Sequence, residues 1–409
     1  MKLQTFIAIL RQFGLKNCLF RVGYQRRKKK GHFERVNPTF DWDDLFAEAI
    51  FRSGEGPDDQ SLRSYLRENT GRFFFPLGQP VRLPDGLADG WQQDPVMHAD
   101  DLEQGFFGYF FDHSGKLGEP GPEGPKVDWF LNPITGQRDT QMVHWSRRGD
   151  FDPDRGDIKY IWEPSRFAWV YDLVRAYVAT DDDRYPKLFW HLLNSWMQAN
   201  PPTIGPGWQC GQEAAIRVMA VCFGLWAFFD HPATTEENLL AALRLLATLG
   251  NRIEVNIDYA KSQRSNHSST EALGLVMLGL LFPTMNGADR WCRIGRKTLE
   301  HDAKRHFWSD GSYLMHSFNY QRMTMHCFLW AMRLAELAHA PFSEQAYAAM
   351  ARSTRFLEQQ LDASGRMPNY GSNDGALISP LCSGDYLDYR PLLGAMRHLI
   401  AREEPTGEQ

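Results

Sequence analysis

The chain has 409 residues, of which 43% are hydrophobic and 23% are charged, and its formal net charge at pH 7 is -5. These values are typical of a globular protein with a large core. The acidic balance argues against nucleic acid as the main partner, and we expect none. The local exception is a short basic run at residues 26–30, which is more often a solvated surface than a binding site.

The sequence contains no run long enough for a transmembrane helix. Residues 1–19 make a poor signal peptide, because they contain Arg11 and Lys16 and lack a small-residue cleavage site. We therefore expect a cytoplasmic protein, with the periplasm as the alternative. The six cysteines are scattered and no metal-ligand spacing is present, so we expect reduced thiols, no metal site and no cofactor.

The first part of the chain, residues 1–150, is expected to form N-terminal helices and an irregular arm that packs on the rest. Apolar residues occur at helical spacing in 40–51 and 61–74. Residues 75–160 are instead rich in Gly, Pro, Asp and Trp and show little helical periodicity. Long irregular segments of this kind usually form functional loops or wrapped arms rather than free linkers.

From Glu163 onward the apolar residues recur at helical spacing, and clear breaks separate one helix from the next. Ser165 is expected to cap the first of these helices, which ends before Asp181. The next helix runs from Tyr185 to Trp196. Further helices are predicted over roughly 211–229, 236–260, 268–281, 288–306, 321–339 and 343–361.

These helices recur at intervals of about 25 residues and pair as antiparallel hairpins, which must stack into a solenoid or close into a ring. The helix at 211–229 is apolar nearly all round, as expected of an inner layer in a closed ring. We therefore predict an all-α chain with an (α/α) toroid at 151–400 and a tail at 401–409. An open solenoid is the alternative.

Two polar clusters flank the predicted helix pair at 268–306. Asn266 and His267 lie in the first cluster, just before the pair, and Tyr320 lies in the second, at 310–321. Both clusters are loop-to-helix junctions at the same end of one hairpin. Loops displayed on a rigid helical scaffold can bring such groups together, so we predict a functional site at this end.

Three parts of the sequence resemble the heparinase II/III-like family. They are residues 162–167 with Trp196 and 200–201, residues 208–217, and Asn266-His267 with 310–312 and 317–320. The resemblance covers roughly 130–400 and implies an incomplete (α/α) toroid that acts as a polysaccharide lyase on uronate-containing glycans. Family members commonly carry a β-sandwich domain after the toroid. The chain stops soon after the point where that domain would begin, so we expect the domain to be missing.

β-Elimination on a uronate requires that its carboxylate is neutralised, that a base removes the C5 proton and that an acid protonates the departing O4. Amide and imidazolium groups can stabilise the charge that develops on the carboxylate. The resemblance assigns this role to Asn266 and His267. The alternative is that Ser265 or Asn266 caps the following helix, with Glu271 nearby.

Tyr320 is the candidate acid and base, and the alternative is a core tyrosine at a helix start. Its reference pKa near 10 means that a neighbouring cation must favour the phenolate if it is to act as a base. The sequence offers Arg322, His316 and His267 for this purpose. Family members often carry His directly after this tyrosine, whereas this chain has Gln321. A tyrosine that acts as both acid and base, or a remote histidine, is therefore favoured.

Other polar and aromatic residues near these motifs are predicted to bind substrate. Glu213 and Arg217 are four residues apart on a helix, so an internal ion pair is the alternative for them. The polar loop at 369–375 is expected to form a turn that lines the same cleft. The predicted substrate-binding set is Trp208, Gln212, Glu213, Arg217, His316, Arg322 and Asn373.

The sequence thus predicts a polysaccharide lyase that cleaves a uronate-containing acidic polysaccharide or oligosaccharide by β-elimination, in bacterial surface-polysaccharide metabolism. One alternative is a glycoside hydrolase on the same scaffold, which needs two carboxyl groups flanking the bond. Glu213, Asp310 and Asp374 are the candidates for that role. The other alternative is a non-catalytic protein that binds or assembles glycans.

Overall fold

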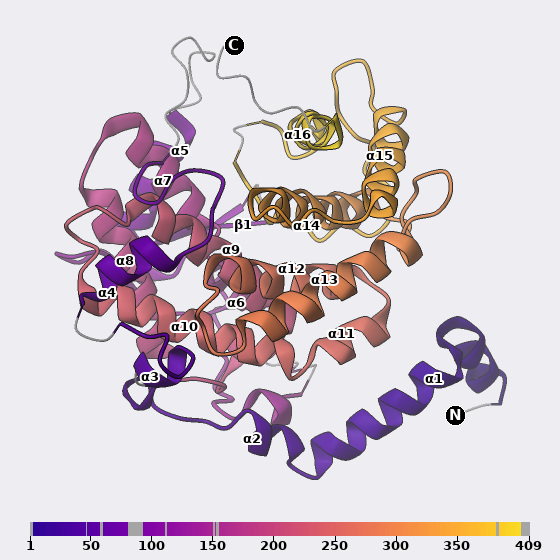
Figure 1. The fold of residues 1–409 in the computed structure, drawn as a ribbon, viewed down its shortest axis with the longest axis horizontal. Helices are drawn as coiled ribbons and strands as arrows, with labels where there is room; N and C mark the ends of the chain where they lie inside the picture. Colours follow the sequence, from indigo (N-terminus) through magenta and orange to yellow (C-terminus); the bar gives the residue numbers. More distant parts are fainter. Residues whose placement is uncertain are drawn as a thin grey trace.

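The computed structural model describes residues 3–45, 47–57, 60–80, 93–110, 113–149, 152, 155–381 and 384–401. Paired helices form most of it (Figure 1). The inner layer contains α7 (Trp169–Thr180), α9 (Gly211–Phe228), α12 (Asn266–Leu281) and α14 (Phe318–Leu337). The outer layer contains α8 (Arg184–Ala199), α10 (Glu236–Glu254), α13 (Ala288–Arg305) and α15 (Glu344–Glu358).

Each inner helix packs against the next one, α7 on α9, α9 on α12 and α12 on α14, and each is followed along the chain by its outer partner. Every residue of α9 is buried, as its uniformly apolar sequence predicts. The described chain after α15 adds α16 (Arg390–Ala401), which packs on α14 and α15. The predicted incomplete (α/α) toroid of antiparallel hairpins is confirmed.

Several helix bounds differ from the predicted ones, and the starts of two inner helices matter for the site. The predicted helix at 236–260 divides into α10 and α11 (Ile257–Gln263), with Asn256 between them. Helix α12 begins at Asn266 and α14 begins at Phe318, two or three residues earlier than expected. Asn266, His267 and Tyr320 therefore lie in the first helical turns rather than in the preceding loops.

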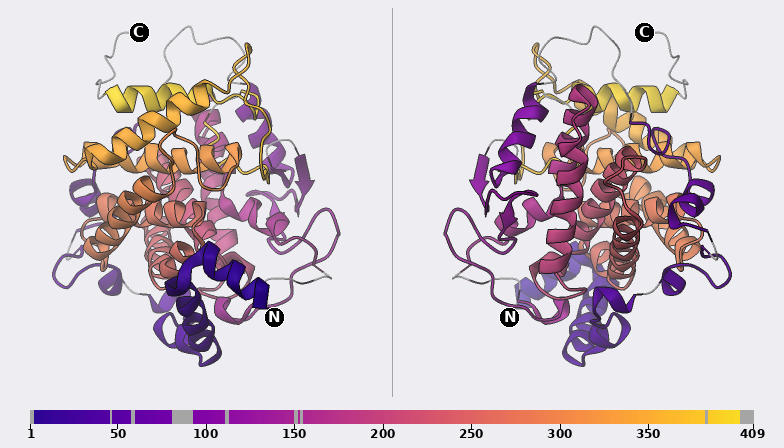
Figure 2. Two further views of the ribbon diagram at one scale, coloured as in Figure 1. Left: turned by 90° about the vertical axis from the view of Figure 1, so that its right-hand side faces the viewer. Right: turned by 90° about the vertical axis from the view of Figure 1, so that its left-hand side faces the viewer.

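The N-terminal helices are α1 (Leu3–Lys29), α2 (His32–Val36), α3 (Ala47–Ile50) and α4 (Leu62–Asn69). Helix α1 extends away from the ring (Figures 1 and 2) and is kinked at Gly14. The basic run at 26–30 largely belongs to its last turn, where the helix dipole favours cations.

The expectation of irregular chain over 75–160 was wrong in part. This segment contains α5 (Gln93–Glu103), which packs on α7, and the short helix α6 (Lys159–Trp162). It also forms two antiparallel hairpins, β1 (Phe106–Tyr109) with β2 (His113–Lys116) and β3 (Gly118–Glu119) with β4 (Lys126–Val127). Pro95 lies in the first turn of α5, where a helix tolerates proline, and it obscured the helical pattern.

A continuous hydrophobic core reaches from Tyr24 to Leu399 and includes residues on both sides of the expected boundary at 150. Trp129, for example, packs its ring on Phe107 and donates a hydrogen bond to Ser195 on α8 at 3.1 Å. The boundary itself stays a prediction, and residues 402–409 of the expected tail lie outside the described residues. Among the described helices, none combines the length and apolar character that crossing a membrane requires.

Candidate active site

The candidate site lies where the N-terminal ends of α12 and α14 meet the loop at 369–375. Ser317 caps α14, because its hydroxyl accepts a hydrogen bond from the Tyr320 backbone N–H at 3.2 Å. The same hydroxyl donates to the Ser372 carbonyl of the loop. Gly371 has a φ of 79°, and a Cβ atom there would overlap the His316 carbonyl oxygen. A glycine is therefore needed for the loop to approach the helix so closely.

Tyr320 and Asn319 both bind Asp374 of this loop. The Tyr320 hydroxyl donates to Asp374 Oδ2 at 3.2 Å, and Asn319 Nδ2 donates to Asp374 Oδ1 at 3.1 Å. Asn319 is held in this orientation because its Oδ1 accepts from Arg322 at 3.1 Å and from the Tyr386 hydroxyl at 2.6 Å. The carboxylate of Asp374 thus has a fixed position against the phenol.

The phenol of Tyr320 is a poor acid in this environment. Burial and the charge of Asp374 raise the pKa of Tyr320 to about 12, while the cation that opposes them is Arg166. Tyr320 is therefore protonated at neutral pH and donates to Asp374. None of the three neighbours expected from the sequence, Arg322, His316 and His267, is the cation that acts on this phenol.

Asn266 is buried, and its side chain does not cap helix α12. Its Nδ2 lies 3.4 Å from Gln212 Oε1 and 3.1 Å from the Met323 sulfur, which is a weak acceptor. Ser265 occupies the N-cap position but makes no side-chain capping bond. The capping alternative therefore does not hold for either residue, and the amide of Asn266 makes one long hydrogen bond and one bond to sulfur.

His267 is partly buried beside Asn266, with Nδ1 3.8 Å from the sulfur of Cys210. Burial lowers the pKa of His267 to about 4, and nearby Arg166 lowers it further, whereas the charges of Glu213 and Asp374 oppose the shift. The expectation of an imidazolium is thus corrected for the unliganded chain, because the ring is neutral at pH 7.

Arg166 joins these groups into one cluster. It follows Pro164 in a short 3₁₀ turn, and its Nε and Nη2 donate to the two oxygens of Glu213 at 2.7 and 2.8 Å. Its Nη1 contacts Glu163. Burial raises the pKa of Glu163 to about 7, and Arg166 opposes that rise. A bidentate guanidinium–carboxylate pair of this kind is a strong, directional interaction.

The Glu213–Arg217 ion pair, the alternative to a substrate-binding role, does not form. Glu213 pairs with Arg166 instead, because a tertiary partner outcompetes the residue four positions along the helix. Arg217 is fully buried, donates to the carbonyls of Ser165 and Gly207, and stacks on Trp196 at 4.9 Å. Arg217 is therefore a core residue and not a substrate contact.

Two more predicted contacts are placed in the interior. Trp208 has no exposed surface and packs between Trp42 and Trp196, at ring distances of 6.1 and 5.8 Å. Arg322 lies over the rings of Tyr386 and Tyr389, at 4.1 and 4.5 Å. Trp208 therefore supports the core, and Arg322 acts on the site only by orienting Asn319.

The remaining predicted residues differ in their positions. Gln212 is buried beside Asn266, with Nε2 3.6 Å from the Met323 sulfur, and His316 is exposed at the start of the α14 junction. Asn373 is exposed, and its Oδ1 lies 2.7 Å from the Tyr386 hydroxyl oxygen. Asp310, the hydrolase candidate, is exposed and binds Ser312 of its own loop, away from this cluster.

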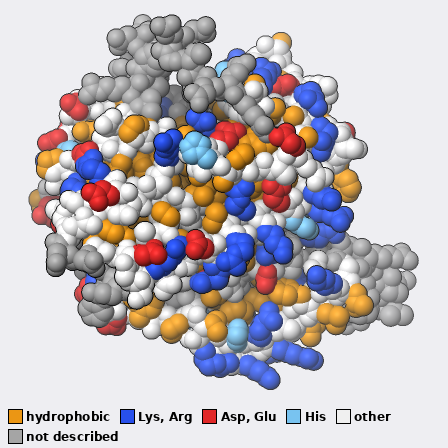
Figure 3. Space-filling model, in the orientation of Figure 1, with side chains coloured by type: hydrophobic (Ala, Val, Ile, Leu, Met, Phe, Trp, Pro, Cys, Tyr) orange, Lys and Arg blue, Asp and Glu red, His pale blue; other side chains and the backbone are white. Residues whose placement is uncertain are grey.

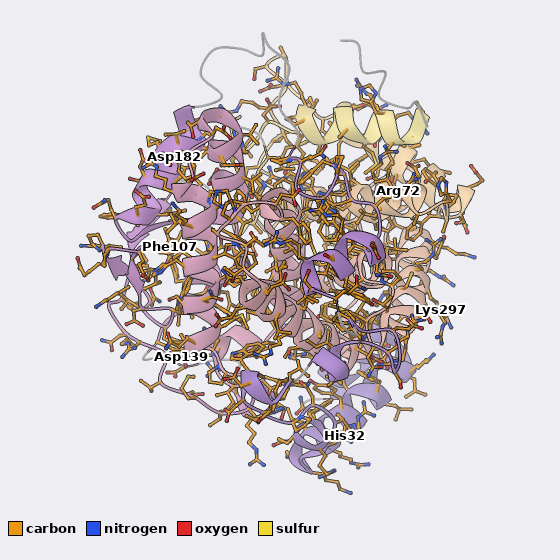
Figure 4. All side chains as sticks on the ribbon, turned by 60° about the vertical axis from the view of Figure 1, so that its left-hand side comes forward. His32, Arg72, Phe107, Asp139, Asp182 and Lys297 are labelled. Atoms are coloured by element: carbon orange, nitrogen blue, oxygen red, sulfur yellow. The ribbon has the colours of Figure 1, made fainter. Side chains whose placement is uncertain are left out.

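Two cavities adjoin the cluster and share Phe110, His113 and Gly375 in their walls. The first has a volume of about 500 Å³ and includes Glu163. The second has a volume of about 470 Å³ and includes Asn369, Asn373, Asp374, Tyr386, Lys159 and Tyr160. Phe107, in the wall of the first cavity, is labelled in Figure 4. The volumes lie within the range of small-ligand sites.

Sequence reasoning missed the roles of Arg166, Glu163, Asn319 and Tyr386 in this cluster. Arg166 lies within the segment that carried the resemblance, and Asp374 lies in an Asn-Asp-Gly turn, so each had a local signal. The contacts that define their roles join distant parts of the chain. Within the described residues, no group of three or more His, Cys, Asp or Glu side chains is arranged to hold a metal ion.

Comparison with known proteins places this chain in a family. The family model described as the heparinase II/III N-terminus matches residues 95–361, which is more than half of the chain. A heparin-sulfate lyase of Pedobacter heparinus is 24% identical over 163 residues, which cover 38% of this chain and 24% of that protein.

Two solved structures share the fold. A heparinase III gives a TM-score of 0.53 at 16% identity, over 84% of this chain and 51% of that one. The heparan sulfate lyase HepC of Pedobacter heparinus gives 0.53 at 18% identity, over 75% of this chain and 44% of that one. The chain spans about half the length of these structures and about a quarter of the curated relative. On the match to residues 95–361, the chain belongs to the heparinase II/III family.

Proposed function

We propose that this site cleaves a uronate-containing polysaccharide by β-elimination. The observation that carries the proposal is that His267 on α12 and Tyr320 on α14 share the charges of Asp374 and Arg166 as neighbours. Asn266 directly precedes His267 on α12, and Asp374, which accepts the hydrogen bond of Tyr320, lines one of the two cavities. The names of the relatives, heparin-sulfate lyase and heparan sulfate lyase, support the same class of reaction.

In the proposed reaction, Asn266 and His267 bind the uronate carboxylate. The Asn266 amide offers a donor that is held by a long bond to Gln212 and a bond to the Met323 sulfur, and His267 offers a ring N–H. An anion placed beside His267 stabilises the imidazolium and so raises its pKa from about 4. The positive charge of Arg166 adds to the stabilisation of the enolate-like transition state.

Tyr320 enters the proposed reaction as the proton donor to O4. With a pKa of about 12, forming its phenolate at pH 7 costs about 7 kcal/mol, a large part of a typical enzymatic barrier. As a donor, Tyr320 starts from its populated protonated form, and the alkoxide that develops at O4 is a stronger base than the phenolate, so O4 can take the proton. We assign the protonation of the leaving oxygen to Tyr320 for this reason.

Glu163 is the group that we assign as the base. A general base is most effective when its pKa lies near the working pH, and the pKa of Glu163 is about 7. Its carboxyl lines the 500 Å³ cavity. The C5–H bond breaks toward Glu163, the C4–O4 bond breaks, C4=C5 forms, and O4 takes the proton of Tyr320. The expected surface-polysaccharide role and cytoplasmic location stay predictions.

The test is to incubate the 409-residue chain with a panel of uronate polymers and to follow the ultraviolet absorbance of the unsaturated uronate. We expect a product from at least one polymer, and its loss in Tyr320→Phe. Absence of unsaturation with every polymer would contradict the proposal. New reducing ends without unsaturation would identify a hydrolase, and tight binding without turnover that survives Asn266→Ala would identify a glycan-binding protein.

A further inference from the structure

A third cavity, which is strongly basic, lies between α1, α11 and α13. Its volume is about 880 Å³, and Phe20 and Ile294 contribute apolar surface to its wall. Figure 3 shows Lys and Arg side chains gathered over this part of the molecule. The cations that line the cavity are Lys16, Lys261, Arg264, Lys297 and Arg305, and the carboxylates are Asp258 and Asp302.

The two carboxylates leave most of these cations unpaired. Asp258 is paired with Lys261 at 3.1 Å. Asp302 is buried and accepts hydrogen bonds from the hydroxyls of Ser268 and Ser269, at 2.6 and 2.9 Å. Within the described part of the chain, three lining cations form no ion pair, and they are Lys16, Lys297 and Arg305.

A buried imidazole in the same wall also lacks a partner. His306 lines the cavity and is almost completely buried, with Nε2 3.5 Å from Asp302. Its Nδ1 has no hydrogen-bond partner among the described residues. That nitrogen has almost no accessible surface, so His306 adds a buried polar group to the wall of the cavity but no open donor or acceptor.

We propose that this cavity binds an anionic segment of a glycan, bearing carboxylate or sulfate groups, as a site separate from the candidate active site. Lys297 and Arg305 lie about 12 Å apart along the axis of α13, so an extended polyanion can contact both and one small ion cannot. The inference rests on the proposed function, because an acidic polymer that is cleaved at the candidate active site carries further anionic segments at a distance from the bond that breaks.

The position of the cavity suits this role. Figure 4 places Lys297 and Phe107 on opposite sides of the molecule, so the basic cavity is distinct from the cavity that contains Phe107. Arg264, at one end of the basic cavity, precedes Asn266 by two residues and has a φ of 52°. The basic cavity therefore reaches the segment that leads into the candidate active site without including its cluster.

Charge reversal on one helix provides a matched test. In Tyr320→Phe, used to prevent turnover, we would introduce Lys297→Glu with Arg305→Glu and compare it with Arg293→Glu plus Lys304→Glu. All four residues are exposed on α13, and only the first pair lines the cavity. Calorimetric titration with uronate and sulfated oligosaccharides of increasing length should show binding weakened about tenfold or more by the first pair and less than twofold by the second.

Equal effects of the two pairs would overturn the proposal, as would displacement of the oligosaccharide by equimolar inorganic sulfate or phosphate. Neutral dextran of the same length should not bind. If a thermal melt shows that the first pair of substitutions unfolds the chain, Lys16→Glu takes its place as the test, since Lys16 lines the cavity from α1. Selective loss of binding in a chain that forms no unsaturated product would retain this site and refute only the proposed lyase. Normal lyase activity without a selective loss of oligosaccharide binding would retain the proposed lyase and refute only the site in the basic cavity.

Discussion

Replacing Asp374 by Asn should lower the pKa of Tyr320. The substitution removes the negative charge beside the phenol but keeps a side chain that can still hydrogen-bond both Asn319 and Tyr320. The phenol pKa is raised from 10.0 to about 12, first by burial and then by Asp374. Because burial remains, we expect a fall of no more than two units, which is at most about 2.7 kcal/mol.

The measurement is a pH titration of tyrosinate absorbance, taken as the difference between chains with Tyr320 and with Tyr320→Phe. The same difference is measured in the Asp374→Asn background, so the other tyrosines cancel. An unchanged or higher pKa in that background would refute the assignment of Asp374 as the charge that acts on Tyr320. A loss of lyase activity without this change in pKa would show that Asp374 acts through some other contact.

Three other outcomes follow from the site. Because the folded pKa of His267, about 4, lies below the ordinary 6.5, its contribution to stability is present above pH 6.5 and is lost toward pH 4, by up to about 3 kcal/mol. Thermal melts of wild type should therefore fall more steeply over that window than those of His267→Gln. The kcat/KM of wild type should rise with pH through about 7, and Glu163→Gln should lose this limb and most of the activity. Gly371→Ala should lower stability by roughly 1–3 kcal/mol, seen as a lower Tm, because of the positive φ and the overlap with His316.

Each of these outcomes has a contrary result. Parallel melts of wild type and His267→Gln would mean that folding does not lower the pKa of His267. A flat profile in wild type, or an unchanged one in Glu163→Gln, would remove Glu163 as the base. A Gly371→Ala variant as stable as wild type would mean that the loop can move away from α14. The control for that variant is Gly136→Ala, since Gly136 also has a positive φ but has open space around its Cβ position.

The inner helices could be predicted from the sequence because burial on all sides leaves a continuous apolar pattern. In α9 every residue is buried, and the predicted bounds, 211–229, differ from the observed ones by one residue. The starts of α12 and α14 were placed too late because their first turns carry polar side chains that face the site, and such residues resemble loop or capping residues in a sequence.

The pairing of charged groups could not be predicted in the same way. Spacing favoured Glu213 with Arg217, but Arg166 lies 47 residues before Glu213 and binds it through two hydrogen bonds. The Tyr320–Asp374 contact likewise spans 54 residues. Local rules describe one helix, and only the packing of α9, α14 and the loops decides which distant charge is nearest. Trp208 shows the same limit, since its aromatic character suited a sugar platform and the core equally.

The fastening of the loop at 369–375 to the start of α14 has a consequence for engineering. Ser317 and Gly371 hold the two segments together, so Tyr320 and Asp374 would move together in any displacement of α14. Transplanting Tyr320 into another helical ring without the loop would deliver a phenol that lacks the carboxylate raising its pKa, and the graft would have to include both segments to reproduce that contribution.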